Sequence, residues 1–194
     1  MTRYGNSSAR VGPAAPPFPA EVQKAIDAVM RGNPPLVLFT TLDHDPRLFH
    51  KFFAGGLLDR GNLTIRQREI VIDRVTASCG AEYEWGVHVS VYADKAGLDR
   101  AQIESLVTGG ADDPCWSDDE RVLIRLCDSL HTNCTVADEL WSELATLHAE
   151  EAIIELLMLA GFYRTVSYLV NGLRLPLEPG ATRFADVTSD ARTA

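Results

Sequence analysis

The most constraining feature of this chain of 194 residues is a long apolar stretch near its carboxyl end, Ala152 to Leu175. Its apolar side chains recur on more faces than a surface helix carries. They are Ile153, Ile154, Leu156, Leu157, Leu159, Phe162, Val166, Leu169 and Val170. We therefore expect the central helix of a bundle, or part of a subunit interface, with Pro176 and Pro179 ending the ordered region.

The rest of the sequence also carries helix signals, and no window shows the alternation of a strand. Residues 64–67, Thr-Ile-Arg-Gln, form a capping box that predicts a helix over 65–78. Gly80 interrupts it, and a second helix is expected over 81–96, before a left-handed stop at Gly97. Further helices are expected from Pro19 to Met30, over 36–42, from Pro46, over 101–107, after the capping box at Ser117, and from Thr135 through Leu144. The expected fold class is all-α.

A weak internal repeat suggests a two-fold helical bundle. An offset of 82 positions places Glu69 on Glu151, and several apolar positions of the two segments coincide. The same offset places Glu84 and His88 on valines, so the second copy keeps the packing and lacks the polar pair. Any chemistry then belongs to the first copy.

One domain accounts for the length and composition of the chain. Residues 1–17 are rich in Pro, Ser, Gly and Ala and are expected to form a disordered arm. A single all-α domain is expected over 18–178, followed by a flexible tail over 179–194. Neither a signal peptide nor a run of ~20 apolar residues is evident, so we expect a cytoplasmic protein without membrane contact.

The charge and the cysteine content of the chain limit the classes of partner that it is expected to bind. The chain has 27 Asp and Glu against 18 Lys and Arg, for a net charge of -9, and its basic residues form no stripe. This argues against nucleic acid and favours a small-molecule substrate. The four cysteines show no C-x-x-C spacing, which suits a reducing compartment. Cys127, His131 and Cys134 have helical spacing, but only three ligands are local, and we expect no metal.

The candidate catalytic residues lie around the predicted turn at Gly80. Glu84 and His88 are four apart on one predicted helix, so their side chains share a face and can form a hydrogen bond. A neighbouring carboxylate favours a protonated imidazole and burial opposes it, which can tune the imidazole for acid/base chemistry. Glu69, on the antiparallel partner helix, would complete a relay, and Tyr83 offers a hydroxyl donor beside it.

Each of these residues also has a purely structural interpretation. A Glu and a His four apart are common on a solvated helix face, and Asp73, four after Glu69, fits such an acidic face. Cys79 is either a reactive thiol near an imidazole or a small buried hydrophobe. Trp85 is either part of a substrate pocket or a core aromatic.

At these same residues the sequence resembles the carboxymuconolactone decarboxylase and alkylhydroperoxidase D superfamily. The similar stretches are 63–71, Tyr83-Glu84-Trp85-Gly86-Val87-His88, 96–103, and 151–173 with the core Ala-Gly-Phe-Tyr-Arg. The resemblance covers about residues 20 to 178. It implies an all-α fold, assembly into dimers, trimers or hexamers, and active sites near subunit contacts.

In the thiol peroxidases of that superfamily, a relay of glutamate and histidine activates a C-x-x-C pair. The resemblance places the relay glutamate on Glu69, the histidine on His88, and the two cysteines on Ala81 and Glu84. Both thiols are therefore missing, and Cys79 is displaced by two residues from the nearer position. A carboxylate in place of a thiol suits proton transfer, and the decarboxylases of the superfamily work without metal or organic cofactor.

The leading hypothesis is a cofactor-independent lyase or isomerase acting on a small oxygenated or carboxylated molecule. His88 would be the general acid/base, Glu69 would orient it, and Glu84 with Tyr83 would complete the polar wall. One alternative is a peroxide-reducing, antioxidant protein that uses Cys79. Another is a catalytically silent helical oligomer that binds a ligand.

Overall fold

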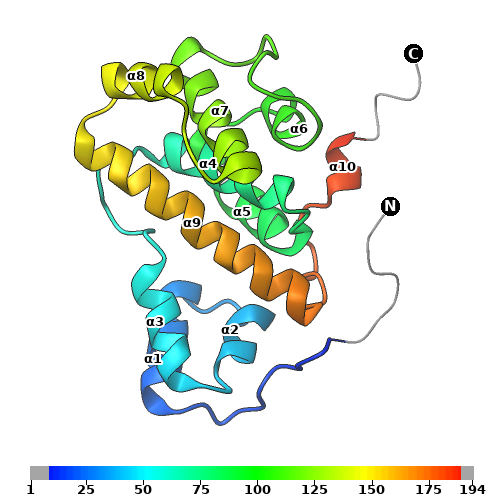
Figure 1. Ribbon diagram of the computed structural model, residues 1–194. Coiled ribbons are helices and arrows are strands. Elements are labelled where there is room, and N and C mark those ends of the chain that lie inside the picture. Colours follow the sequence, from blue (N-terminus) through cyan, green and yellow to red (C-terminus); the bar gives the residue numbers. More distant parts are fainter. Residues whose placement is uncertain (1–8, 189–194) are drawn as a thin grey trace.

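The computed structural model describes residues 9–188, and every regular element within them is a helix (Figure 1). The order is α1 (Ala20–Met30), α2 (Val37–Leu42), α3 (Pro46–Gly55), α4 (Ile65–Ser78), α5 (Glu82–Ala96), α6 (Arg100–Thr108), α7 (Asp118–Asn133), α8 (Asp138–Leu147), α9 (Glu150–Leu173) and α10 (Phe184–Thr188). The all-α fold class is confirmed. Most of these bounds lie within two residues of the prediction, because the caps that set them are local.

The α4–α5 hairpin shows how local chemistry sets the frame of the molecule. The Thr64 side chain accepts a hydrogen bond from the backbone N–H of Gln67, whose side chain in turn accepts one from the N–H of Thr64. Gly80 adopts a φ of 61° and reverses the chain, and Gly97 ends α5 with a φ of 64°. Glycine reaches these left-handed conformations without a steric penalty, so the hairpin is fixed by four local residues.

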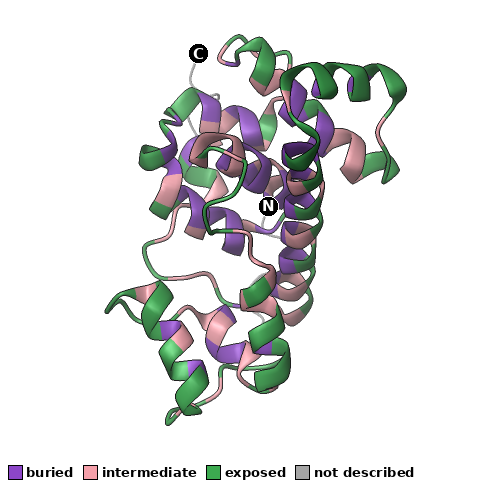
Figure 2. Cartoon of the chain, turned by 90° about the vertical axis from the view of Figure 1, so that its left-hand side faces the viewer, coloured by how far each residue is buried: buried purple, intermediate pink, exposed green. Residues whose placement is uncertain are grey.

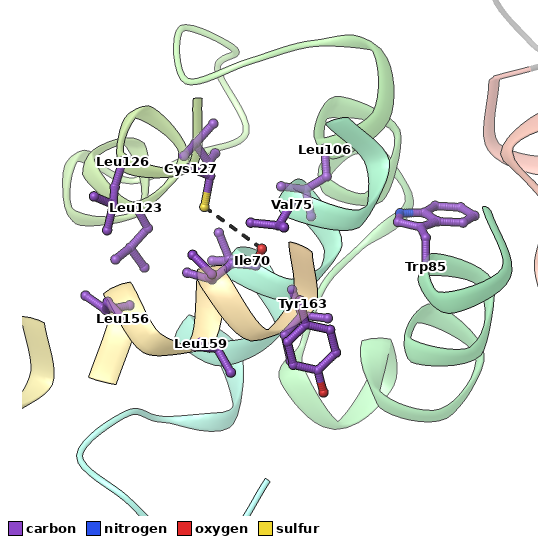
Figure 3. Packing of buried hydrophobic residues seen from close by; sticks show 14 of the residues in the cluster. Ile70, Val75, Trp85, Leu106, Leu123, Leu126, Cys127, Leu156, Leu159 and Tyr163 are labelled. Atoms are coloured by element: carbon purple, nitrogen blue, oxygen red, sulfur yellow. Dashed lines mark hydrogen bonds between the residues drawn. The ribbon is translucent and has the colours of Figure 1, made fainter. Parts of the chain in front are cut away.

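Helix α4 lies at the centre of the bundle, with α5, α7 and α9 packed around it (Figure 1). Figure 3 shows Leu156 and Leu159 of α9 in one cluster with Ile70 of α4 and Leu123 of α7. Since α4 is enclosed on several sides, three of its polar residues, Glu69, Asp73 and Thr76, are buried as well.

Helix α9 is the long apolar helix that the sequence predicted. Within residues 9–188 it alone is long and apolar enough to span a membrane by length and composition, whereas the sequence predicted no segment of that kind. In the window that meets this test, 44% of the residues are buried, and α9 packs on α4 as a core helix does. Its outer face leaves Ile154, Met158 and Tyr168 more than half exposed. Figure 2 shows exposed, green segments along the long helix.

The internal repeat does not extend to the shape of the backbone. The segment that corresponds to the hairpin lies largely in the single helix α9. Under the offset of 82 residues, Phe162 takes the place of Gly80 and continues the helix instead of turning the chain.

The first three helices form a smaller group at one end of the molecule (Figure 1). Val22, Ile26 and Phe49 are its buried centre, separate from the main core. Phe52 joins it to α9 through Phe162, whose ring centroid is 5.2 Å away.

Two predicted terminal segments fall partly outside the described residues. Residues 1–8 of the expected arm and 189–194 of the expected tail are not described. Within the tail, α10 packs beside α6, and the Phe184 ring centroid lies 4.7 Å from that of Trp85. Gly86 permits this arrangement, because a Cβ atom there would lie 2.4 Å from the backbone oxygen of Thr182.

Candidate active site at the α4–α5 hairpin

Three ionisable side chains of the hairpin meet inside the protein. The Nδ1 atom of His88 lies 2.8 Å from Oε2 of Glu69, across the two helices. Its Nε2 atom lies 3.5 Å from Oε1 of Glu84, one turn earlier on α5. The exposed fractions are 0% for Glu69, 4% for His88 and 7% for Glu84. The imidazole is therefore held between two carboxylates, and Glu84 is the member nearest to solvent.

The surroundings of His88 decide its charge. Burial alone lowers the pKa of an imidazole, but the hydrogen bonds and charges of Glu69 and Glu84 outweigh it and raise the pKa of His88 to about 10. At neutral pH the ring is thus an imidazolium, which can donate a proton and cannot accept one. Two aromatic rings pack against it, Tyr163 edge-on with centroids 5.0 Å apart and Tyr92 at 5.3 Å.

Two further charged residues, Asp73 and Arg68, lie close to Glu69. The alternative interpretation of Asp73 and Glu69 as a solvated acidic face is wrong, because both side chains are buried. Burial, then the charge of Glu69, raises the pKa of Asp73 well above its usual range, so a neutral carboxyl is favoured. Arg68 lies with its Nε atom 3.7 Å from Oε1 of Glu69. The apolar residues around α4 were the available signal, since a helix apolar on several faces has no solvated face.

Tyr83 lies on the same helix but makes contacts elsewhere. Its hydroxyl donates to the carboxylate of Glu178 and accepts a hydrogen bond of 3.0 Å from the backbone N–H of Leu38. Glu178 also accepts from the N–H of Val37 at 2.6 Å. Tyr83 therefore joins α5, α2 and the segment after α9, and the structure does not place its hydroxyl against His88.

Trp85 is a core residue in this structure. Its side chain is fully buried and packs against Phe184 of α10. In Figure 3 its ring lies beside α5, at the edge of the group of labelled side chains. The pocket-lining position expected for Trp85 is not what its contacts show.

The cysteines divide between the core and a different surface. The Sγ atom of Cys79 lies 4.0 Å from Nδ1 of His131, so its imidazole neighbour is not His88. The Cys127 thiol is buried and donates to the backbone oxygen of Val71 at 3.9 Å (Figure 3). Among residues 9–188, no group of three or more His, Cys, Asp or Glu side chains is arranged to hold a metal ion.

Comparison with known protein families finds a match to the part of the chain that contains the α4–α5 hairpin. Residues 46–123, which include α4 and α5, match the sequence model of the Carboxymuconolactone decarboxylase family. No curated protein sequence matches the chain.

Several solved structures share the fold at low sequence identity. An uncharacterized peroxidase-related protein from Silicibacter sp. TM1040 is 18% identical, with a TM-score of 0.77 over 95% of this chain and 99% of that one. The alkylhydroperoxidase AhpD core protein of Ralstonia eutropha JMP134 is 16% identical, with a TM-score of 0.73 over 89% of this chain and 95% of that one. The debrominase Bmp8, in complex with 2,3,4-tribromopyrrole, is 14% identical, with a TM-score of 0.75 over 89% and 93%.

Proposed function

We propose an acid/base enzymatic function for this chain, which belongs to the carboxymuconolactone decarboxylase and alkylhydroperoxidase D-like superfamily. The reaction is a cofactor-independent lyase or isomerase reaction on a small oxygenated or carboxylated organic molecule. The observation that carries the proposal is the position of His88 between Glu69 at 2.8 Å and Glu84 at 3.5 Å.

The charge of His88 determines whether it first donates or first accepts a proton in this reaction. An imidazolium between two carboxylates donates first, so His88 is the general acid that delivers a proton to a developing carbanion or enolate. Such a proton is needed after loss of carbon dioxide and during a double-bond shift. Glu69, fully buried, fixes the ring through Nδ1 and leaves Nε2 as the donating atom.

Glu84 is the group best placed to face the substrate. It is the most exposed of the three and lies next to the donating Nε2 atom. Its Oε2 atom is buried and has no hydrogen-bond partner among the described residues, so it can accept a hydrogen bond from a substrate hydroxyl or acid. In the thiol peroxidases that the sequence resembles, a cysteine takes this position, and a carboxylate replaces thiol chemistry with proton transfer.

One structural neighbour bears on the size of the substrate. The debrominase Bmp8, in a variant form with one cysteine replaced by alanine, holds a small ring compound, 2,3,4-tribromopyrrole. We infer a substrate of similar size for this chain. Whether that substrate is a carboxylated or a carbonyl compound is what the following experiment distinguishes.

The test is proton transfer to carbon, measured by NMR in deuterated water with a panel of small β-keto acids, enol lactones and unsaturated ketones. We expect the wild-type protein to introduce deuterium at carbon and to keep this activity after dialysis against EDTA. His88→Asn and Glu84→Gln should each reduce the rate at least ~100-fold, the usual effect of losing a general acid. An equal rate in His88→Asn, with its fold intact by circular dichroism, contradicts the proposal.

The burial of the relay residues favours a second candidate function, which is ligand binding without catalysis. Glu69, His88 and Glu84 are all at least nine-tenths buried, as a purely structural network would be. The chain would then be a helical oligomer that binds a ligand without turnover. In that case the same variants change the unfolding free energy, while no member of the panel is converted by the wild-type protein.

A further inference from the structure

A second group of reactive side chains lies where α4 and α7 end against α9. Cys79 is the C-cap of α4, His131 lies in the last turn of α7, and Cys134 is the C-cap of α7. Arg164 of α9 is adjacent to His131. None of these residues takes part in the Glu69–His88–Glu84 site.

The guanidinium of Arg164 is held in place by several contacts. Its Nη1 atom lies 3.5 Å from Nδ1 of His131 and 3.3 Å from the backbone oxygen of His131. Its Nε atom donates to the hydroxyl of Tyr168 at 2.8 Å. The hydrogen bond to Tyr168 raises the pKa of Arg164, and the Cys79 and Cys134 thiols act in the same direction. Both thiols are therefore within electrostatic range of this cation.

The contacts around His131 define the route of the thiol proton. Arg164 has only N–H donors, so Nδ1 of His131 faces it as an acceptor, with the ring proton on Nε2. The Cys79 thiol faces the same Nδ1 atom at 4.0 Å. The Cys79 sulfur thus lies beside an imidazole nitrogen that a guanidinium also contacts, and a base and a cation next to a thiol are typical of reactive cysteines.

We propose that Cys79, with His131 as base and Arg164 as cation, is a thiol-modification site that forms a mixed disulfide with small anionic disulfides. The thiolate attacks one sulfur of the disulfide, and a new S–S bond forms as the old one breaks. The leaving half departs as a thiolate and takes the proton that His131 received from Cys79. Two electrons stay within the sulfur atoms, so no further oxidant is required.

The preference for an anion follows from the charges at this place. The chain carries a net charge of -9, yet the groups around the Cys79 sulfur are a guanidinium and an imidazole. A carboxylate on the disulfide pairs with Arg164 while its sulfur approaches Cys79. A neutral disulfide lacks this pairing.

The chain offers an internal control in Cys115. Cys115 is also free and only partly exposed, but its thiol contacts the backbone oxygen of Ala101 at 4.0 Å instead of a base. Burial raises the pKa of Cys115. Cys134 is exposed and is replaced by serine in all test proteins, so that it does not dominate the reaction.

The test compares two probes on the full-length Cys134→Ser protein, with the modified cysteine identified by peptide mass spectrometry. The charged probe is 5,5′-dithiobis(2-nitrobenzoate), and the neutral probe is 2,2′-dithiodipyridine. We expect the charged probe to modify Cys79 about tenfold faster than Cys115. Arg164→Met should lower the Cys79 rate several-fold with the charged probe and less with the neutral one, and Arg164→Lys should retain most of it.

Equal rates at Cys79 and Cys115 overturn the proposal, and so does an Arg164→Met protein that keeps the wild-type rate with the charged probe. His131→Gln should slow Cys79 with both probes, since it removes the base. His88→Asn, which tests the proposed function, should leave Cys79 unchanged, so the failure of one idea is separable from the failure of the other.

Discussion

His88 donates through Nδ1 to Oε2 of Glu69 at 2.8 Å, although the two residues are nineteen positions apart on different helices. The contact exists because the turn at Gly80 folds α5 back along α4. It places the imidazole beside a fully buried carboxylate, with Glu84 on the opposite side of the ring. The pair therefore links the stability of the hairpin to the protonation of one imidazole.

The first prediction concerns stability against pH. The pKa of His88 is raised from 6.5 to about 10 in the folded protein, so the native state holds this proton more tightly than the unfolded state. The stabilisation is complete below pH 6.5 and is lost as the pH rises towards 10. We expect urea denaturation to show a fall in unfolding free energy of roughly 2 to 5 kcal/mol across this window. His88→Asn should remove most of the fall, and an unchanged pH profile in that variant would refute the assignment.

The second prediction concerns Asp73. Its pKa is raised, so the native protein favours the neutral carboxyl, and stability is lost as the pH rises above 3.8, its unfolded value. Asparagine has the shape of the neutral acid and no charge to bury. Asp73→Asn should therefore stabilise the protein at pH 7 by about 1 to 3 kcal/mol and change it little at pH 3, as measured by denaturant unfolding. The matched control is Asp112→Asn on the exposed surface, which should be close to neutral at both values. A destabilised Asp73→Asn protein would mean that the ionised form is the native one.

The third prediction separates Tyr83 from the catalytic residues. Tyr83→Phe removes the donor to Glu178 and the acceptor for the N–H of Leu38. We expect a loss of about 1 to 3 kcal/mol in unfolding free energy, because a buried backbone N–H is left without its partner. Deuterium incorporation per folded molecule should stay within about twofold of the wild type. Tyr168→Phe, an exposed tyrosine with one side-chain hydrogen bond, should cost less stability. A large loss of turnover in Tyr83→Phe would return the residue to the catalytic set.

The sequence alone was sufficient to predict the parts of the structure whose determining residues are close together in the chain. The capping box at Thr64 and the turn at Gly80 act within a few positions, so the hairpin and its Glu69–His88 contact were predictable. The long apolar segment that became α9 was equally visible, because a broad apolar surface requires partners on many sides.

The sequence alone was insufficient to predict contacts between side chains that are far apart in the chain. The hydroxyl of Tyr83 meets Glu178, 95 positions away at the last residue of the expected domain. The thiol of Cys79 meets His131, 52 positions away, and no spacing rule connects them. A solvated face remained a possible interpretation of Asp73, because helical periodicity describes one helix, whereas the burial of Asp73 depends on the helices around it.

The last prediction concerns the covering of α5 by the chain that leads to α10. A Cβ atom on Gly86 would lie 2.4 Å from the backbone oxygen of Thr182, and backbone cannot yield as a flexible side chain does. Gly86→Ala should therefore displace this segment, weaken the hydrogen bond of 2.9 Å between Thr182 and Ser90, and open the contact between Phe184 and Trp85. Hydrogen exchange read by mass spectrometry should show faster exchange in α10, with α4 still protected. Gly161→Ala is the matched control, since nothing lies within 4 Å of its Cβ position inside α9, and it should be neutral or stabilising by up to about 1 kcal/mol. If both variants protect α10 equally, the close approach at Gly86 does not hold the segment in place.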